Sequence, residues 1–404
     1  MAAQARYDLA VVGAGLLGLA SAYRLLERSP GLRIVVLEKE PGPARHQSGH
    51  NSGVVHAGLY YAPGSLKAQL CRAGAAALRE KCGEWEIPVI RRGKLVVASS
   101  EAELERLAEL ERRGRENGID GLQMLDGDEL RRIEPDVQGV RALHVPETSV
   151  VDFKLVAARL TDELRARRVE FRFGACLTGV EARTGHVRMQ TTAGDIEASA
   201  LVACAGLQSD RVAELAGAAP GVRIVPFRGA YWQLSDTAAA LVRGLVYPVP
   251  DPSFPFLGVH FTRGADDRVT AGPNAVPALA REGYRRTAFS LRDSREAFLW
   301  PGFARLARRY AKTGAVEIWR DSVKAAAVAD MRRYIPAISM RDVNRGGSGI
   351  RAQAMSPQGL LVDDFVIEDG PASLHVLNAP SPAATSCLAI GSVIAERAVE
   401  RFGL

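Results

Sequence analysis

A glycine motif near the start of the chain constrains the fold more than any other feature. Residues 13–18 read GAGLLG, between an apolar run at 7–12 and a stretch at 16–28 with helical periodicity. A second apolar run follows at 33–38. Two short buried strands joined by a helix predict a right-handed β-α-β unit with parallel strands. The chain is therefore expected to begin with a Rossmann-type domain.

The spacing of the three glycines predicts what this unit binds. Gly13 permits a tight turn, Gly15 lets a pyrophosphate approach the backbone, and Gly18 lets the helix pack closely on the strand. The helix N-terminus then presents free N–H groups to an anion. Glu38 ends the second strand 25 residues after Gly13, and its carboxylate can accept hydrogen bonds from a ribose diol. We predict a bound dinucleotide, and these residues do not distinguish NAD from FAD.

Length and charge set wider limits. The chain has 404 residues, enough for roughly two or three domains. Lys and Arg total 52 and Asp and Glu total 46, a net charge of +6 with no long basic run, which does not fit a nucleic-acid binder. The five cysteines show no C-x-x-C spacing, so a reducing compartment is expected. No targeting segment is evident, and we expect a cytoplasmic protein.

The rest of the chain predicts a fold of mixed class, α/β plus α+β. Ser100 with Glu103 has the capping-box spacing, and Asp152 is a predicted helix N-cap. Alternating apolar and polar residues at 222–275 predict an antiparallel sheet. Predicted helices lie at 65–82, 100–117, 153–168 and from Pro382 to 402, and predicted strands at 169–173, 176–181, 186–191 and 195–203.

Signals typical of the nucleotide domain recur in the middle and at the end of the sequence, so a second domain is expected to be inserted in two pieces. The discontinuous nucleotide-binding domain is predicted to comprise 1–88, 146–220 and 342–404, and the substrate domain 89–145 and 221–341.

A histidine-rich loop follows the second predicted strand. Three of the seven histidines, His46, His50 and His56, lie within 45–61 among Gly, Ser and Asn. The loop has few carboxylates and no H-x-x-x-H helix, so we predict no metal site. Two alternatives remain: histidines with a purely structural role, or a cofactor-facing loop in which a neutral imidazole takes a hydroxyl proton.

At this point the motifs resemble one family. GAGLLG, HQSGHNSGVVHAGLYYAPGSLKA, VPFRGAYW, YPVPDPSFPFLGVHFT, GPNAV, GIRAQ and NAPSPAATSCLAIG are similar to FAD-dependent L-2-hydroxyglutarate dehydrogenases/oxidases, within the D-amino-acid-oxidase-like flavoproteins. The resemblance extends from about residue 6 to the end of the chain. It implies a discontinuous Rossmann-type FAD-binding domain beside a substrate domain built on an antiparallel sheet, with the flavin where they meet.

The resemblance also implies which residues hold FAD. Glycines 13, 15 and 18 with Glu38 would hold the pyrophosphate and ribose, and the helix after Thr385 would direct its N-terminus at the flavin. The full set implied to bind the cofactor is Gly13, Gly15, Gly18, Glu38, Lys39, His46, Asn51, Ser52, Gly53, Val180, Gly206, Ser209, Pro380, Ala383, Ala384 and Thr385.

A short 2-hydroxy dicarboxylate needs a cation for its C1 carboxylate and a base for its C2 hydroxyl. Arg351 is the predicted carboxylate clamp, with a domain-interface salt bridge as the alternative. His56 and His260 are both candidate bases, and the sequence does not rank them. Predicted secondary substrate contacts are Tyr60, Tyr61, Arg228 and Tyr231, of which Arg228 fits a structural role equally well.

A basic segment suggests where the electrons go. Residues 281–312 hold nine Lys or Arg and three Asp or Glu, an excess of +6, with aromatic residues between them. We predict that it contacts the cytoplasmic face of the inner membrane peripherally and that quinone or oxygen accepts the electrons. The alternative is a solvated helical face. Rival functions are a related flavoprotein oxidising glycerol 3-phosphate or an amino acid, and an RNA-modifying or scaffold flavoprotein.

Overall fold

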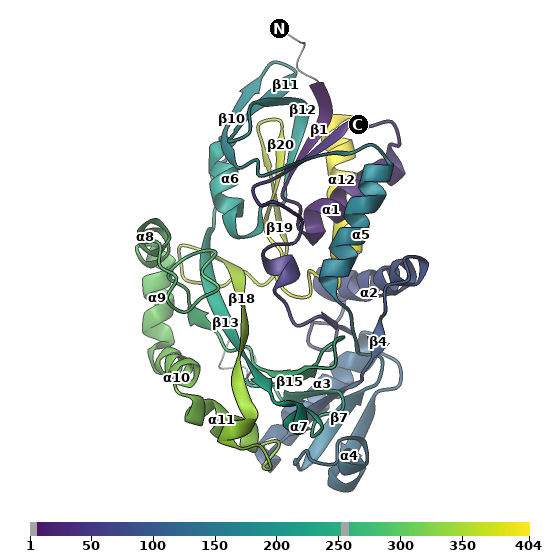
Figure 1. Ribbon diagram of the computed structural model, residues 1–404, viewed down its shortest axis with the longest axis vertical. Helices are drawn as coiled ribbons and strands as arrows, with labels where there is room; N and C mark the ends of the chain where they lie inside the picture. The colour runs from purple at the N-terminus through teal and green to yellow at the C-terminus, as the bar shows by residue number, and fades with distance from the viewer. Residues whose placement is uncertain (1–5, 252–257) are drawn as a thin grey trace.

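The computed structural model describes residues 6–251 and 258–404, which form two lobes, each built around one large β-sheet (Figure 1). We call the lobe that contains both described ends of the chain the nucleotide lobe, and the other the second lobe. A small sheet of β3 (Val54–Val55), β4 (Ile90–Arg91) and β8 (Ser149–Val150) completes the strand pairing.

The sheet of the nucleotide lobe brings three distant parts of the sequence together. Its central strands β9, β2, β1, β12 and β20 run parallel, and β10, β11 and β19 pair antiparallel at its borders. The strands are β1 (Arg6–Val12), β2 (Ile34–Glu38), β9 (Glu170–Phe173), β10 (Leu177–Arg183), β11 (His186–Thr191), β12 (Ile196–Ala203), β19 (Val366–Gly370) and β20 (Ser373–Asn378).

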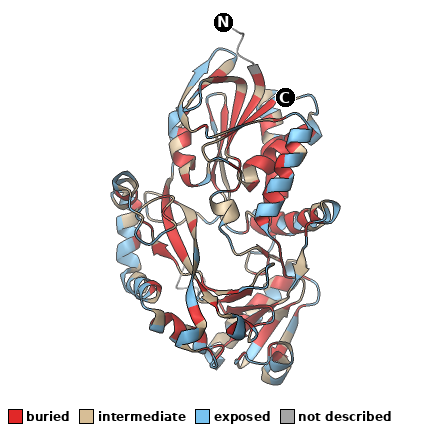
Figure 2. Ribbon diagram, viewed as in Figure 1, coloured by how far each residue is buried: buried red, intermediate tan, exposed pale blue. Residues whose placement is uncertain are grey.

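Both faces of this sheet are covered, which explains why β1 and β2 are apolar at every central position (Figure 2). Leu9 and Val11 pack with α1, α2, α5 and α12, whereas Ala10 and Val12 pack with α6 on the other face. These helices are α1 (Leu16–Arg28), α2 (Leu66–Glu84), α5 (Phe153–Ala166), α6 (Ser209–Leu215) and α12 (Cys387–Phe402).

The sheet of the second lobe is mostly antiparallel, as its alternating sequence predicts. Its longest strands, β13 and β18, pair along almost their whole length, and β14 with β5 is its parallel pair. The strands are β5 (Lys94–Ala98), β6 (Gln123–Asp126), β7 (Arg141–Val145), β13 (Arg223–Leu234), β14 (Leu245–Pro248), β15 (Phe261–Arg263), β16 (Val269–Ala271), β17 (Val276–Pro277) and β18 (Val343–Met355).

Seven helices of the described chain surround this second sheet. They are α3 (Leu104–Glu116), α4 (Gly127–Ile133), α7 (Asp236–Ala239), α8 (Leu291–Phe298), α9 (Pro301–Arg309), α10 (Ala311–Ser322) and α11 (Lys324–Arg332). Helices α8 to α11 follow one another along one flank of the molecule (Figure 1).

Most of the predicted elements are present, but two local predictions differ from the structure. The predicted capping box at Ser100 is wrong. A short 3-10 turn at Glu101–Glu103 follows Ser100, whose side chain makes no capping hydrogen bond, and α3 begins only at Leu104. The Glu103 carboxylate accepts instead from Ser99 N at 2.6 Å. Strand β18 lies within 342–404, the segment predicted to belong to the nucleotide-binding domain, yet it pairs with β13 of the second lobe. By contrast, Asp152 caps α5 as predicted, with Lys154 N donating to Oδ1 at 2.8 Å.

A buried ion pair joins the two lobes. Arg281, which follows β17, donates through Nη2 to Oδ2 of Asp210 in α6 at 2.9 Å, and both side chains are buried. Asp210 Oδ2 also accepts from Ile224 N at 3.0 Å, at the start of β13. A buried charge that lost its partner would destabilise the fold by about 3–5 kcal/mol, so this pair holds the lobes in one arrangement.

Candidate active site

A cavity of about 1350 Å³ lies where the two lobes meet. The nucleotide lobe contributes the glycine turn, the histidine loop and the residues just before α12, and the second lobe contributes β13, β18 and the residues around His260. Of the predicted site residues, those that line the cavity are Gly13, Gly15, Glu38, Lys39, His46, Asn51, Ser52, His56, Tyr60, Tyr61, Gly206, Tyr231, His260, Arg351, Pro380, Ala383, Ala384 and Thr385.

The glycine turn is packed so closely that side chains have no room. Gly13 has a φ of +102°, and a Cβ there would lie 2.5 Å from the carbonyl oxygen of Cys204. A Cβ on Gly18 would overlap the carbonyl oxygen of Gly13, so α1 can approach β1 only without one. Ser48 Oγ accepts from Leu16 N at 2.9 Å and ties the histidine loop to the first turn of α1. The N-terminus of α1 therefore borders the cavity, as a pyrophosphate site requires.

Glu38 lies at the carboxyl end of β2, on the cavity wall. Its Oε2 accepts from Ala14 N at 2.8 Å and its Oε1 accepts from Glu40 N at 2.9 Å. Two backbone donors thus fix the carboxylate beside the glycine turn. This is the position from which an acidic side chain binds a ribose diol in a dinucleotide fold.

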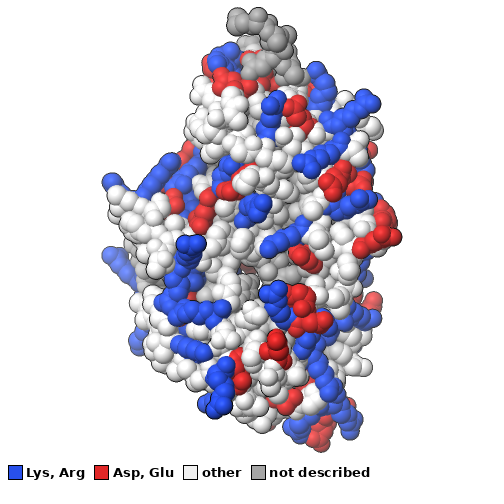
Figure 3. Space-filling view, in the orientation of Figure 1, with Lys and Arg blue, Asp and Glu red and all other residues white. Residues whose placement is uncertain are grey.

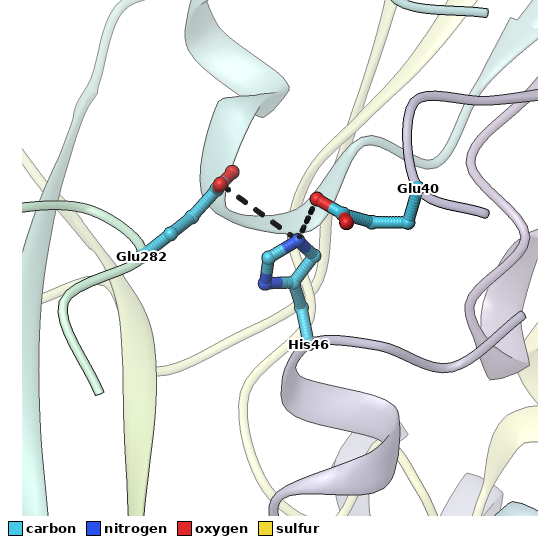
Figure 4. A group of neighbouring side chains, drawn as sticks. All are labelled: Glu40, His46 and Glu282. Carbon is cyan, nitrogen blue, oxygen red and sulfur yellow. Dashed lines mark hydrogen bonds and ion pairs between the residues drawn. The ribbon is translucent and has the colours of Figure 1, made fainter. Parts of the chain in front are cut away.

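Beside it, Glu40, His46 and Glu282 come from different segments and point toward one another (Figure 4). His46 Nε2 lies 3.0 Å from Glu40 Oε1 and 3.8 Å from Glu282 Oε2. Their donor types could hold a metal ion, but Lys39 Nζ lies 2.7 Å from His46 Nε2 and 2.9 Å from Glu282 Oε2 and also pairs with Glu40. The lysine ammonium supplies the positive charge that these groups need, and the cluster connects Glu282 of the second lobe to the nucleotide lobe.

The segment before α12 is attached to the histidine loop. Thr385 Oγ1 accepts from His56 N at 3.1 Å and donates to Val54 O at 3.2 Å. A Cβ on Gly74 would lie 2.4 Å from the Cα of Ser386, so α2 holds the same segment from its other side. The N-terminal end of α12 is thereby fixed toward the cavity, where its dipole favours negative charge.

The two candidate bases are both neutral imidazoles. Burial, with the nearby Lys94 and His260, lowers the pKa of His56 to about 3. Burial also lowers the pKa of His260 to about 4, against a smaller rise caused by its hydrogen bond to Gly258. His260 Nδ1 lies 2.9 Å from Gly258 O, and since a carbonyl only accepts, Nδ1 carries the proton and Nε2 has a lone pair. Its ring packs on Tyr247 at 4.2 Å between centroids.

Arg351 reaches the cavity from β18, where it is paired in register with Phe227 of β13. Burial lowers the pKa of its guanidinium, and nearby Tyr231 opposes that shift. A guanidinium remains charged at neutral pH, so the cavity has a fixed cation. Gly349 of the same strand passes so close to His50 that a Cβ there would lie 2.5 Å from the His50 carbonyl oxygen.

Five predicted site residues do not line the cavity. Gly18 and Gly53 lie in the backbone packing next to it, and Val180 is paired with Met189 in the β10–β11 ladder. Ser209 Oγ donates to Leu377 O at 2.9 Å inside the protein. Arg228 donates to Asp321 Oδ2 at 2.6 Å in a buried ion pair on the other side of β13, so the structure gives it the structural role rather than the substrate contact.

Some cavity residues were not predicted. Ser48 caps α1, Tyr247 packs on His260, and Lys67 reaches the wall from α2. Lys94 does not line the cavity, but its ammonium contacts the rings of Tyr60 and Tyr247, which do, and it was not predicted either. A lysine directly before an apolar strand is typical of an exposed strand end, so the sequence offered no signal for its burial.

The architecture matches known flavoenzyme structures. L-alpha-glycerophosphate oxidase from Mycoplasma pneumoniae, with FAD bound, superposes with a TM-score of 0.79 at 21% identity, covering 98% of this chain and 95% of that chain. Glycine oxidase from Geobacillus kaustophilus gives 0.72 at 18% identity, covering 98% and 95%. This likeness confirms the predicted fold class, a Rossmann-type nucleotide-binding domain beside a domain built on an antiparallel sheet.

The chain belongs to the FAD dependent oxidoreductase family, whose model matches residues 8–397. It is 43% identical over 397 residues to an L-2-hydroxyglutarate dehydrogenase of Indibacter alkaliphilus, covering 98% of this chain and 100% of that protein. It is 42% identical to the Escherichia coli K12 enzyme of the same name, covering 97% and 93%, and 41% identical to the human mitochondrial one, covering 100% and 91%. The resemblance inferred from the motifs is confirmed.

Proposed function

We propose that this protein is an FAD-dependent dehydrogenase that oxidises L-2-hydroxyglutarate to 2-oxoglutarate. The observation that supports it most is the meeting of Arg351, His56 and His260 in one cavity that continues to the glycine cradle. Relatives at 41 to 43% identity over nearly the whole chain carry the name of that activity. A cation for a carboxylate and a neutral base for a hydroxyl are the groups that the oxidation of a 2-hydroxy acid requires.

The residues present fit FAD. The Gly13 turn leaves backbone room that a Cβ would fill, and the α1 N-terminus offers N–H groups to a pyrophosphate. Glu38 would hold the adenosine ribose, and the end of α12 after Thr385 would face the flavin. When bound, FAD supplies a two-electron acceptor for the hydride on C2 of the substrate.

The side chains of the cavity would bind the substrate and accept its hydroxyl proton. Arg351 would hold the C1 carboxylate through two parallel hydrogen bonds and so fix the direction of the C2–H bond. We assign the base to His260, because its Nδ1 proton is committed to Gly258 O and Nε2 is therefore ready to accept the hydroxyl proton. His56 is the alternative base, and it lies close enough to His260 for the charge of His260 to lower the pKa of His56.

Anaerobic reduction of the purified protein tests the function directly. We expect a yellow protein whose flavin absorbance is bleached by L-2-hydroxyglutarate, and not at a comparable rate by the D-isomer, lactate, malate, an L-amino acid or glycerol 3-phosphate. A colourless protein that does not take up FAD contradicts the assignment of the cofactor. Fast bleaching by glycerol 3-phosphate or an amino acid assigns the chain to a sister activity.

The pH dependence of kcat/KM tests the base. Protonation of a His260 whose pKa is lowered to about 4 removes the base only in that range, so the acid limb should lie well below the ordinary histidine value near 6.5. His260→Gln should lower kcat by about 100- to 10,000-fold. His186→Gln, in β11 of the nucleotide lobe, is the control. If His56→Gln causes the larger loss, His56 is the base.

Replacing Arg351 tests the clamp. Arg351→Ala should lower kcat/KM for L-2-hydroxyglutarate by roughly 100-fold or more, because the carboxylate would enter a buried site without its partner. Arg351→Lys should recover only part of the loss, since an ammonium cannot make the two parallel hydrogen bonds. Arg345→Ala, an exposed position on the same strand, is the matched control. Normal kinetics of the Arg351→Ala variant would contradict the assignment of Arg351 as the carboxylate clamp.

We further propose that helices α8 to α10 contact an anionic membrane surface and bring the flavin near a quinone acceptor, with oxygen as the other acceptor. Exposed apolar residues gather on this flank, with exposed fractions of 64% for Leu291, 72% for Leu299 and 55% for Trp319. Lys and Arg side chains lie among them along the left-hand edge of Figure 3. Arg281 does not contribute, because it is buried against Asp210. Among the described helices, none is long and apolar enough to cross a membrane.

Co-sedimentation with lipid vesicles tests this surface. The protein should bind vesicles containing phosphatidylserine at low salt, bind less at high salt, and bind pure phosphatidylcholine weakly, because the attraction is partly electrostatic. Leu299→Ser with Trp319→Ser should lower the binding about 10-fold. Leu155→Ser, which changes a residue 50% exposed on α5, is the control. Equal sedimentation with and without vesicles at low salt would exclude the contact.

A further inference from the structure

Lys94 is a buried cation in the second lobe that the roles assigned above do not use. It is the first residue of β5, in which all five residues are buried, and its relative exposure is 1%. The strand lies inside the second sheet, between β14 and β7. An ammonium group at such a place loses its hydration and needs compensation from its surroundings.

The partners of the other buried cations make Lys94 unusual. Within residues 6–251 and 258–404, four Lys or Arg residues are buried, and three of them pair with a carboxylate. These three pairs are Lys67–Asp363, Arg228–Asp321 and Arg281–Asp210. Lys94 makes no ion pair with any described residue. Its ammonium instead lies over two rings, 4.5 Å from the centroid of Tyr60 and 5.4 Å from that of Tyr247.

These rings compensate only part of the charge, because a cation–π contact contributes about 0.5–2 kcal/mol. The pKa of Lys94 is accordingly lowered by burial to about 8, so the group is still charged at neutral pH. A second polar group beside it also lacks a partner: the hydroxyl of Tyr60 is buried and makes no hydrogen bond within the described chain. Buried hydroxyl groups are normally hydrogen-bonded, so the Tyr60 hydroxyl has an unused donor beside the Lys94 ammonium.

The wall of the cavity connects these two features to it. Tyr60 and Tyr247 line the cavity, and Lys94 lies in the next layer, against these two rings. The charges of Arg351 and Lys94 both lower the pKa of His260, so the proposed base lies within electrostatic range of two cations from different strands. A 2-hydroxy dicarboxylate has a matching pattern, since its hydroxyl carbon stands between two carboxylates.

We propose that Lys94 and the Tyr60 hydroxyl form the subsite for the distal carboxylate of the substrate. The Tyr60 O–H donates to that carboxylate, and the Lys94 ammonium supplies the balancing charge. This inference rests on the proposed function and deepens it, because it assigns the preference for a diacid over a monoacid to two residues. Arg351 holds the C1 carboxylate, which both kinds of substrate share.

The comparison of a diacid with a monoacid of the same length tests the subsite. L-2-hydroxyglutarate and L-2-hydroxypentanoate differ only in the distal group, so the ratio of their kcat/KM values measures its recognition. Lys94→Met should lower this ratio on the order of 100-fold, because a buried carboxylate would lose its charge partner. Tyr60→Phe should lower it about 10-fold. Arg351→Ala should reduce both kcat/KM values and leave the ratio within a few fold.

A binding measurement without turnover provides the second readout. Calorimetric titration with glutarate and with pentanoate should show that Lys94→Met weakens glutarate binding and leaves pentanoate binding unchanged. Lys81→Met is the matched control, because that lysine also lies over a tyrosine ring, 5.9 Å from the centroid of Tyr23, but pairs with Glu84 at 2.8 Å outside the cavity. Lys81→Met should change neither the diacid-to-monoacid ratio of kcat/KM values nor the affinities for glutarate and pentanoate.

The outcomes separate this proposal from the proposed function. If wild-type flavin is bleached by L-2-hydroxyglutarate but the diacid-to-monoacid ratio is unchanged in Lys94→Met and Tyr60→Phe, the subsite is wrong and the function stands. If neither hydroxy acid bleaches the wild-type flavin, the proposed function is wrong, and the subsite that rests on it is wrong with it. Should Lys94→Met lose its flavin through misfolding, Tyr60→Phe, which keeps the ring under the ammonium, decides alone.

Discussion

The close contact between α1 and β1 is the constraint on which the rest of this structure depends. Because Gly18 has no side chain, the helix can lie directly against the carbonyl of Gly13. That contact directs the α1 N-terminus at the cavity and places Ala14 N where it holds the Glu38 carboxylate. Ser48 Oγ accepts a hydrogen bond from Leu16 N in the same turn and so fixes the start of the histidine loop. One backbone approach thus positions the nucleotide cradle and the first wall of the active site together.

The second lobe contributes charge rather than scaffold to the site. It brings Arg351 and His260 to the cavity and Lys94 to the layer behind the cavity's tyrosine rings, and burial lowers the pKa of each of these groups. Burial keeps the imidazole neutral while the two cations remain charged at neutral pH, because their ordinary pKa values are much higher. The result is a positively charged site with an unprotonated base, which suits a dianion that must lose a hydroxyl proton.

The meeting of the lobes depends on ion pairs at their junction. Arg281 and Asp210 join them at the base of β13, and Lys39 with Glu282 joins them beside the cradle. From composition alone, the charged residues in these contacts would be expected on the surface. Of the basic excess in 281–312, Arg281 is internal, and the acidic residues of that segment pair with cations of the nucleotide lobe. The remaining exposed basic residues stand beside exposed apolar ones, which gives that flank its amphipathic character.

The sequence by itself determined the elements whose information is local: α1, β1, β2 and the cap at Asp152 follow from periodicity and turn chemistry within a few residues. The motifs also single out Arg351, His56 and His260, and all three line the cavity. Only the tertiary structure decided that Arg228 faces Asp321, that β18 belongs to the second lobe, and that Lys94 is buried without a carboxylate. The face of a long strand on which a cation lies, and the charge it meets there, depend on contacts between segments far apart in the chain, and no local pattern records those contacts.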